Sequence, residues 1–338
     1  MESMPVPIPS ACAKVKIAMS DLFRARSLGL PVALFAVLSF TLPNPALLAQ
    51  CSPAAGSAPA SAWPRVVLNV FALDPAGNPV TPSPTARFQV LQDGTAQTVQ
   101  EVAGSGAPMT LALVLDSSGS DFDWHSQAVS AAQSLIDSLP AGSEVAVVVF
   151  SDHAYCDFPL APLSSFTPRA FEHMESSGPS AVYDALVATE MYIASRAHNP
   201  RRAIVLISDG ADNDSTITLQ QTIDRLLVDG APALYLLAPT PSHGHTSREE
   251  SYRARRAMEL LARYTGGLVF PAKRPEDIPA AAARIRAILR SQVALIYSST
   301  TAAADGQMHR LDVHLDTRDV SIRGLPGFYA PKPLKSVP

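Results

Sequence analysis

Three oxygen-bearing side chains follow a short apolar run in the first half of the sequence. The run covers residues 111–115, and Asp116, Ser118 and Ser120 come after it at alternate positions. Gly119 gives the backbone between the two serines freedom to bend. One carboxylate and two hydroxyls suit a hard cation such as Mg²⁺, which prefers about six oxygens and usually keeps water or a substrate oxygen among them. The pattern therefore indicates a cation site.

The apolar run itself predicts a strand that ends at this site. It is too short for a helix and is typical of a central parallel strand covered on both faces. Open α/β proteins place their ligands at the carboxyl edge of such a sheet. Two later segments have a related layout: the apolar run 203–207 is followed by Asp209, and Ser180 precedes a helix expected to reach about residue 197.

The Asp-x-Ser-x-Ser segment resembles the first metal-binding segment of von Willebrand factor A domains, which carry a metal-ion-dependent adhesion site. In that family a Gly-Gly-Thr-x-Leu-Tyr-Asp-Ala stretch supplies a threonine ligand, and here Ser180 stands at the threonine position, followed by Tyr183 and Asp184. The Ser-Asp-Gly turn at Asp209 resembles the segment whose carboxylate reaches the ion through water. The resemblance implies a Mg²⁺ or Mn²⁺ site made of Asp116, Ser118, Ser120, Ser180 and Asp209.

Other interpretations of these residues remain open. Asp116 could be the N-cap of a helix, where a carboxylate satisfies free backbone N–H groups without any metal. Ser180 lacks the methyl group that helps to fix the rotamer of threonine. Asp212 and Asp214 could form a second acidic shell or a Ca²⁺ loop, although we expect a solvated turn. Arg201 and Arg202 are expected to reach solvent at a strand entrance rather than to bind an anion.

Strand and helix patterns alternate between residues 109 and 290. Helices are predicted at 122–139, 218–227, 249–264 and 279–289, and strands at 144–150, 153–158, 233–237 and 267–270. Alternation of this kind requires a parallel sheet covered by right-handed crossovers. We therefore predict an α/β fold with a doubly wound, mostly parallel sheet, Rossmann-like as in A domains.

The flanking segments 65–104 and 291–331 carry β patterns. The first contains a predicted hairpin from residues 88–92 through Asp93-Gly94 to residues 97–102. The second ends in Arg323-Gly-Leu-Pro-Gly-Phe-Tyr, which resembles the tail of a bacterial subgroup of secreted A-domain proteins. We expect the two segments to pair into one small accessory β unit.

Residues 1–49 resemble a cleaved signal peptide. Arg24 and Arg26 precede the apolar segment 28–42, which is short for a membrane span. Translation could begin at Met1 or Met19. Residues 50–64 are a low-complexity linker, and Gln50 occupies the position where a lipid-anchoring motif at Cys51 needs a small residue. We therefore expect an exported protein, periplasmic or extracellular, without a lipid anchor.

Composition and motifs disfavour several classes of function. With 26 basic and 30 acidic residues the formal net charge is −4, so the chain lacks the basic excess of nucleic-acid-binding proteins. It has no Gly-x-Ser-x-Gly, His-Glu-x-x-His or Gly-x-x-x-x-Gly-Lys motif, and we expect no enzymatic activity. Cys51 and Cys156 indicate no disulfide framework, and no Cys/His spacing indicates zinc.

The resemblance implies an adhesion-type module that binds a partner protein, with a bound cation taking a carboxylate of that partner. Two alternatives remain. The chain could be an envelope scaffold or assembly factor with a vestigial metal site. It could also be a hydrolase that uses the cation, which requires a general base near Asp209. The identity of the partner and the oligomeric state stay open.

Overall fold

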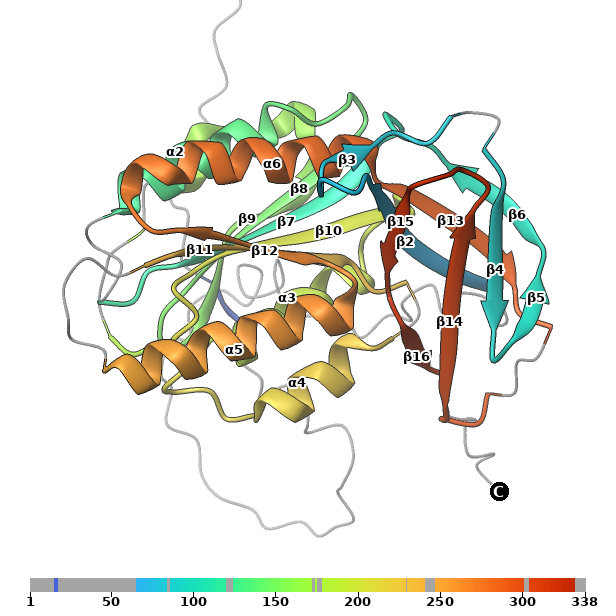
Figure 1. Ribbon diagram of the computed structural model, residues 1–338. Helices are drawn as coiled ribbons and strands as arrows, with labels where there is room; N and C mark the ends of the chain where they lie inside the picture. Colours follow the sequence, from blue (N-terminus) through green and yellow to red (C-terminus); the bar gives the residue numbers. More distant parts are fainter. Residues whose placement is uncertain are drawn as a thin grey trace, which may run out of the picture.

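Strand β7 (Met109–Asp116) lies in the middle of the central sheet, and all eight of its residues are buried. The structure, a computed structural model, describes residues 65–83, 86–119, 124–171, 174, 178–228, 230–240, 247–300 and 304–331, and the backbone of 15–17. Helices lie above and below the sheet that contains β7, and a group of β-strands lies at one end of it (Figure 1).

The central sheet has the strand order β1-β9-β8-β7-β10-β11-β12. Neighbours from β8 to β12 along this order run parallel, whereas β9 is antiparallel to β8 and β1 is antiparallel to β9. The predicted α/β character is thus present. The strands besides β7 are β1 (Val15–Ile17), β8 (Glu144–Phe150), β9 (Ala154–Pro162), β10 (Arg201–Ile207), β11 (Ala233–Pro239) and β12 (Leu268–Ala272).

Helices cover both faces of this sheet. In Figure 1, α2 and α6 lie above it and α3, α4 and α5 below it. Capping boxes, in which an N-cap hydroxyl and the N3 side chain bond reciprocally, fix the starts of α4 and α5. The helices are α2 (His125–Ile136), α3 (Val182–Ala194), α4 (Leu219–Leu226), α5 (Arg248–Thr265) and α6 (Ile278–Ser291), with 3₁₀ turns η3 (Leu163–Ser165), η4 (Pro168–Phe171) and η5 (Pro275–Asp277).

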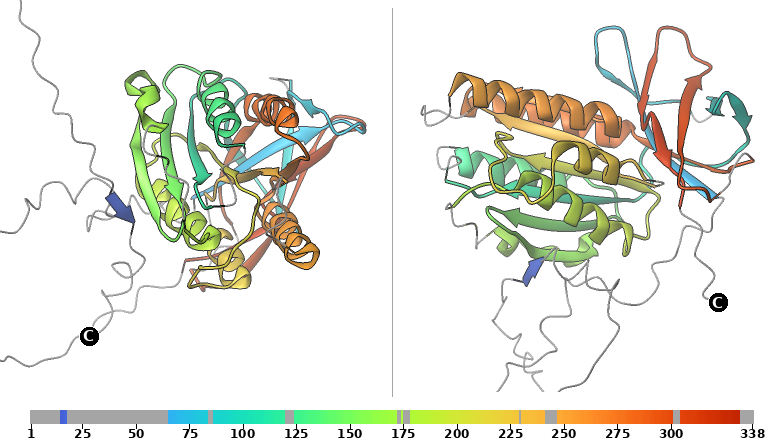
Figure 2. Two further views of the ribbon diagram at one scale, coloured as in Figure 1. Left: turned by 90° about the vertical axis from the view of Figure 1, so that its left-hand side faces the viewer. Right: turned by 90° about the horizontal axis from the view of Figure 1, so that it is seen from below.

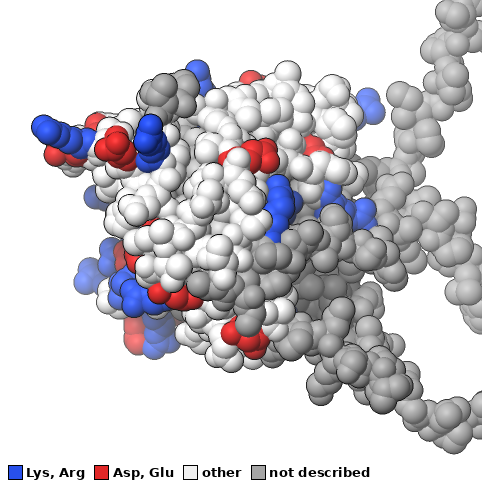
Figure 3. Space-filling view, turned by 90° about the vertical axis from the view of Figure 1, so that its right-hand side faces the viewer, with Lys and Arg blue, Asp and Glu red and all other residues white. Residues whose placement is uncertain are grey.

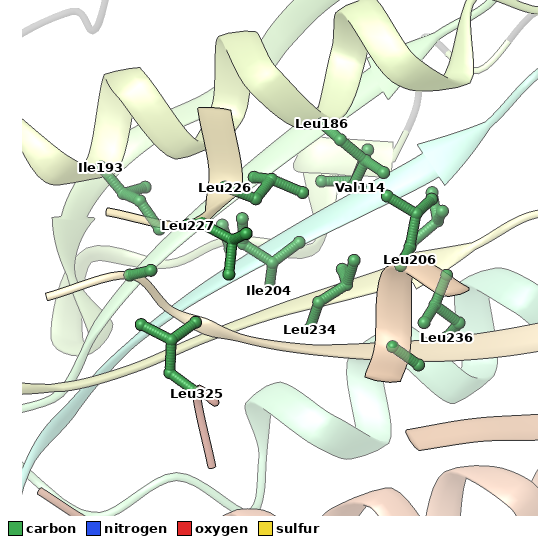
Figure 4. Packing of buried hydrophobic residues seen from close by; sticks show 14 of the residues in the cluster. Val114, Leu186, Ile193, Ile204, Leu206, Leu226, Leu227, Leu234, Leu236 and Leu325 are labelled. Carbon is green, nitrogen blue, oxygen red and sulfur yellow. The ribbon is translucent and has the colours of Figure 1, made fainter. Parts of the chain in front are cut away.

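Apolar side chains fill the space between the sheet and the lower helices. Figure 4 shows Leu186 and Ile193 of α3 beside Ile204 and Leu206 of β10. Leu325, from the C-terminal segment, belongs to the same cluster. The core of the α/β domain therefore continues into the terminal β segments.

The terminal segments form two further sheets. One has the order β15-β2-β13-β6, with β3 beside β2, and the other has the order β16-β14-β4-β5. Strands from before the α/β domain thus pair with strands from after it. The strands are β2 (Arg65–Leu73), β3 (Pro79–Val80), β4 (Phe88–Gln92), β5 (Thr95–Gln97), β6 (Val99–Ala103), β13 (Val293–Ser298), β14 (Met308–Leu315), β15 (Ser321–Gly324) and β16 (Gly327–Tyr329). Among the residues that Figure 3 does not draw in grey, the middle of the face at this end is mostly uncharged, and positive and negative side chains lie together along its left edge.

The predicted hairpin at Asp93-Gly94 is present, but its second strand is shorter than predicted. Gln92 pairs with Thr95, and the two turn residues have φ angles of 51° and 80°, as a two-residue hairpin turn requires. Gln97 pairs with Val90 as predicted, but the prediction that residues 99–102 continue this hairpin was wrong, because β6 pairs with β13 in the other sheet. The buried Gln97 accepts hydrogen bonds from the backbone and hydroxyl of Thr300, which holds the chain where it changes sheets.

A buried polar network joins the β unit to the α/β domain. The Asn69 side chain of β2 accepts hydrogen bonds from the Arg202 backbone at 2.9 Å and from Gln292 at 3.0 Å, and donates to the Ala231 carbonyl at 3.3 Å. Gln292 in turn accepts a bond from the hydroxyl of Tyr235. Buried polar groups that are all hydrogen-bonded favour one arrangement of the elements they connect.

Arg201 differs from the expectation that it would reach solvent. Its side chain is fully buried and donates to the carbonyls of Ala107 and Leu289. Burial lowers the pKa of its guanidinium to about 10. Arg202 is half-buried and donates to the carbonyls of Ala197 and Asn199. Both arginines therefore satisfy backbone acceptors, a role that the apolar pattern of the strand did not reveal.

Glu190 is a buried carboxyl on α3. It is only 5% exposed. Burial raises its pKa to about 7, although the positive charge of Arg202 opposes this shift. The ionised form of this side chain is therefore disfavoured inside the fold.

Of the residues that the structure describes, no helix has both the length and the apolar character to cross a membrane.

We expect Asn69→Ala to lower the free energy of unfolding by about 2–3 kcal/mol, because it leaves buried hydrogen-bonding groups of Arg202, Gln292 and Ala231 without a partner. Chemical denaturation measures this change. Gln89→Ala, which removes an exposed amide from β4, should change the stability by less than about 0.5 kcal/mol. Equal effects of the two substitutions would contradict a structural role for the network.

We expect Glu190→Gln to stabilise the protein by about 3–4 kcal/mol at pH 8 and to have little effect near pH 4. Because the folded-state pKa is raised, the unfolded chain ionises first, and native stability falls as the pH rises from about 4.3 through about 7. Denaturation at several pH values tests this. A constant offset for Glu190→Gln across these pH values would refute the interpretation.

Candidate functional site

Three segments of the chain meet at the carboxyl edge of the central sheet. Strands β7 and β10 are parallel neighbours, with Leu115 opposite Ile207, so the residues that follow them lie side by side. Ser180 comes to the same edge just before α3 begins at Val182. The left panel of Figure 2 views the molecule from this edge.

The buried Asp116 carboxylate connects the three segments. It is 2% exposed. Its Oδ1 accepts a hydrogen bond from the Ser118 backbone N–H at 2.9 Å, and its Oδ2 accepts from the hydroxyls of Ser180 at 3.3 Å and Ser208 at 2.6 Å. Asp116 is not the N-cap of α2, because that helix begins at His125 and the preceding Trp124 has no side-chain cap.

Ser118 is also buried, at 3% exposure. The adjacent Gly119 donates its backbone N–H to the carbonyl of Gly178 at 3.3 Å, which ties this turn to the segment that carries Ser180. Ser120, the third hydroxyl predicted for the site, lies outside the residues that the structure describes. The structure therefore brings Asp116, Ser118 and Ser180 together and leaves Ser120 unplaced.

Ser208 was not predicted from the sequence as a site residue. Its hydroxyl donates to Asp116 and accepts from the backbone N–H of Gly210 at 2.9 Å. The sequence did contain a signal for this role of Ser208. It is the polar residue directly after the apolar run of β10, and β10 neighbours the strand that ends in Asp116. Ser208 therefore holds the Asp116 carboxylate and also shapes the turn that carries Asp209.

Asp209 lies on the wall of a hollow at this edge. The hollow has a volume of about 530 Å³, and Ser118 and Ser180 line it as well. Oδ1 of Asp209 accepts a hydrogen bond from the backbone of Ala211 at 2.9 Å. Gly210 has a φ of +80°, and a Cβ there would come within 2.5 Å of the Met258 side chain, so only glycine fits this turn.

The loop after Asp209 holds both Ser180 and the start of α3. Asn213 accepts a hydrogen bond from the Ser180 backbone at 2.7 Å and donates its own N–H to the Ser180 carbonyl at 2.9 Å. Asp212 and Ser215 accept the free N–H groups at the first turn of α3, including that of Tyr183. The helix has no side-chain cap of its own. The loop therefore supplies the cap from a distant part of the sequence.

Asp212 is half-buried in this cap, and is therefore more than the solvated turn residue we expected. Burial raises the pKa of its carboxyl, while the hydrogen bond from Ser215 opposes the change. Burial, followed by the nearby charge of Asp212, raises the pKa of Tyr183 to about 12. Asp184 accepts hydrogen bonds from the backbone of Thr216 and Ile217. Asp184 and Asp212 therefore lock the loop and the helix to each other.

One distance between predicted ligands matches the spacing around a magnesium-sized cation. Oxygen ligands at about 2.1 Å in an octahedron lie about 3 Å from one another, and Oγ of Ser180 is 3.3 Å from Oδ2 of Asp116. Within the described parts of the chain, no three His, Cys, Asp or Glu side chains group as metal ligands. The predicted set instead combines two carboxylates, Asp116 and Asp209, with serine hydroxyls, which are also ligands that Mg²⁺ accepts.

A family model described as von Willebrand factor type A domain matches residues 111–211. Similar structures include a von Willebrand factor type A protein from Catenulispora acidiphila, with 14% identity, coverage of 75% of each chain and a TM-score of 0.44. No curated protein matches the chain significantly.

Two pilus proteins are also among the similar structures. The PilB minor pilin from Streptococcus sanguinis has 13% identity and a TM-score of 0.43, covering 58% of this chain and 64% of its own. The pilus adhesin SpaC from Lactobacillus rhamnosus GG, in an open conformation, has 12% identity and a TM-score of 0.43, covering 74% of this chain and 40% of its own.

The family match includes every segment that meets at the Asp116 carboxylate. It begins in β7, passes through Ser180 and ends two residues after Asp209. The chain therefore contains a von Willebrand factor type A domain.

Proposed function

We propose that this A domain binds a partner protein through a divalent cation, Mg²⁺ or Mn²⁺. The observation that carries the proposal is that oxygens of Asp116, Ser180 and Ser208 meet next to a hollow. Ser118, Ser180 and Asp209 line this hollow. Asp116, Ser118, Ser120 and Ser180 would hold the ion, and Asp209 would hold a water on it. The proposal includes the doubly wound arrangement predicted from the sequence. In that arrangement helices cover both faces of the sheet, and the carboxyl edge stays open to a ligand.

The bound cation would supply a positive charge that attracts a carboxylate of the partner. The residues of the chain prepare this interaction. Ser208 orients the Asp116 carboxylate through its 2.6 Å hydrogen bond, and Asn213 fixes the backbone of Ser180. Since few carboxylates would contact the ion directly, much of its charge would remain available to an outside group. Binding of the partner should therefore depend on divalent metal.

We propose binding rather than catalysis. Besides Asp209, two carboxylates line the hollow: Asp212, which accepts hydrogen bonds from Tyr183 and Ser215 in the cap of α3, and Glu250. The Glu250 carboxylate accepts the backbone N–H of Ser247 at 2.7 Å in the cap of α5. This hydrogen bond lowers the pKa of Glu250, which weakens it as a base. A scaffold with a vestigial metal site would differ in that a chelator leaves partner binding unchanged.

We also propose that the domain acts outside the cytoplasm. The support comes from the sequence alone, since the charged and apolar segments of the predicted signal peptide, residues 1–49, lie outside the described residues apart from the backbone of β1. An adhesion-type module for a protein partner is consistent with this location.

We expect Asp116→Asn to weaken Mg²⁺ binding by more than about 100-fold, because loss of outer-shell partners alone costs about 10–100-fold. Isothermal titration of Mg²⁺ into the protein measures this. Asn retains an oxygen to accept the hydroxyls of Ser180 and Ser208, so the variant should remain folded. Asp214→Asn, an exposed change in the adjacent loop, is the matched control and should bind as the native chain does. Equal heats from Asp116→Asn and the native chain would reject the site.

We expect Ser208→Ala to weaken Mg²⁺ binding by about tenfold, within the range typical of residues that orient a metal ligand. The Asp116 carboxylate would lose the hydroxyl that fixes its rotamer. Ser117→Ala is the matched control, since the Ser117 hydroxyl bonds to the Phe150 carbonyl instead. If both serine variants bind Mg²⁺ with unchanged affinity while remaining folded, Ser208 has no positioning role.

A further inference from the structure

A second hollow opens beside the first at the same edge of the sheet. Its volume is about 460 Å³, and it lies between the ends of β11 and β12 and the first half of α5. Asp209, Ala211 and Ala254 line both hollows. The two are therefore neighbours that share a wall, and a ligand seated in one reaches the border of the other.

The second hollow has an apolar lining and a basic rim. Ala238, Pro239, Met258 and Val269 line it together with the ring of Tyr252, which is 59% exposed. Arg248 and Arg255 are exposed on its rim, and the Arg255 guanidinium lies 5.6 Å from the centroid of the Tyr252 ring. Asp209, on the shared wall, is the one acidic residue among its described lining. The chemistry favours an apolar side chain that belongs to an acidic segment.

We propose that this second hollow binds an apolar side chain, aromatic or aliphatic, of the same protein segment whose carboxylate is bound at the first hollow. The inference rests on the proposed function and adds the class of ligand. Side chains at alternate positions of an extended segment point to the same side, about 6.6 Å apart. One extended segment can thus place a carboxylate in the first hollow and an apolar group across the shared wall in the second.

The basic rim adds selectivity against cationic segments. A lysine at the position that faces Arg248 and Arg255 would be repelled by two like charges. The rim is exposed, so its effect should fall with added salt. The apolar contact should be less sensitive, because burial of apolar surface does not depend on screening. The ligand class is therefore an acidic segment with an apolar residue two positions from the acidic one.

Synthetic peptides of the form acetyl-Gly-X-Gly-Asp-Gly-X-Gly-amide test the inference with the full chain at saturating Mg²⁺. The symmetric design places X two residues from Asp in either chain direction. Titration calorimetry should show that X = Phe or Leu binds about tenfold more tightly than X = Gly, which corresponds to burial of roughly 60 Å² of apolar surface. The peptide with X = Lys should bind more weakly than the X = Gly peptide.

Variants of α5 test whether the tighter binding of the Phe and Leu peptides comes from the second hollow. Tyr252→Ala removes part of its wall and Ser251→Trp fills it, and both residues line only this hollow of the two. Each should abolish the preference for Phe or Leu while leaving the affinity for the X = Gly peptide and for Mg²⁺ unchanged. Tyr264→Ala is the matched control, because Tyr264 is exposed on the same helix and lines neither hollow; the preference should remain.

The outcomes separate this inference from the proposed function. If all peptides bind equally and the binding requires Mg²⁺, the second hollow has no role and the inference is overturned, while the proposed metal-dependent binding of a carboxylate stands. If Mg²⁺ binds but no peptide does, the proposed binding of a carboxylate fails and the inference fails with it. A Phe preference that persists in both Tyr252→Ala and Ser251→Trp places the apolar contact elsewhere and also overturns the inference.

Discussion

A carboxylate buried at the end of a central strand has to be satisfied by the groups around it, and this constraint organises the carboxyl edge of the A domain. Asp116 is 2% exposed, and an unpaired charge at this position would cost several kcal/mol. The Ser118 backbone and the hydroxyls of Ser180 and Ser208 meet this requirement. These groups come from three separate segments, so the same hydrogen bonds that stabilise the charge also assemble the site.

The fold supplies these partners through two layers of support. Parallel pairing of β7 with β10 is enough to place Ser208 beside Asp116. Ser180 lies outside the sheet and needs the loop 211–217, which bonds to its backbone and caps α3. The β unit adds stability from the opposite end, because Asn69 links β2 to Arg202 and Gln292 inside the α/β domain. Both ends of the sheet are thus held by buried hydrogen bonds.

Local sequence patterns predicted the elements well but not all of their partners. The apolar runs of β7, β8, β10 and β11 were predicted within a few residues, because buried strands have a strong apolar signal. Ser180 was predicted to lie near Asp116, and it does. By contrast, β6 has the same alternation whether it pairs with β4 or β13, so pattern alone could not choose between them. Arg201 was placed wrongly because its acceptors, Ala107 and Leu289, are carbonyls distant in sequence.

Ser208 shows the same limit within the site. Serine at the end of a strand is common, and its role becomes visible only when the neighbouring strand is known to end in a carboxylate. The second hollow was also beyond prediction, since it is built from the ends of β11 and β12 and one face of α5. Residues at such edges have no shared periodicity. Functional residues at the junction of elements are therefore less predictable than the elements themselves.

The turn after β10 couples these features into one preorganised surface. Ser208 bonds Asp116, Gly210 lies against Met258 of α5, and Asn213 holds Ser180. Since φ at Gly210 and the contact with Met258 restrict this turn, a shift of Asp209 would also disturb the packing against the middle of α5 or the loop that caps α3. A ligand that binds here would not need to order the turn, and less of its interaction energy would be lost to immobilising side chains. The wall shared by the two hollows is therefore tied to the sheet, to α5 and to the loop that caps α3.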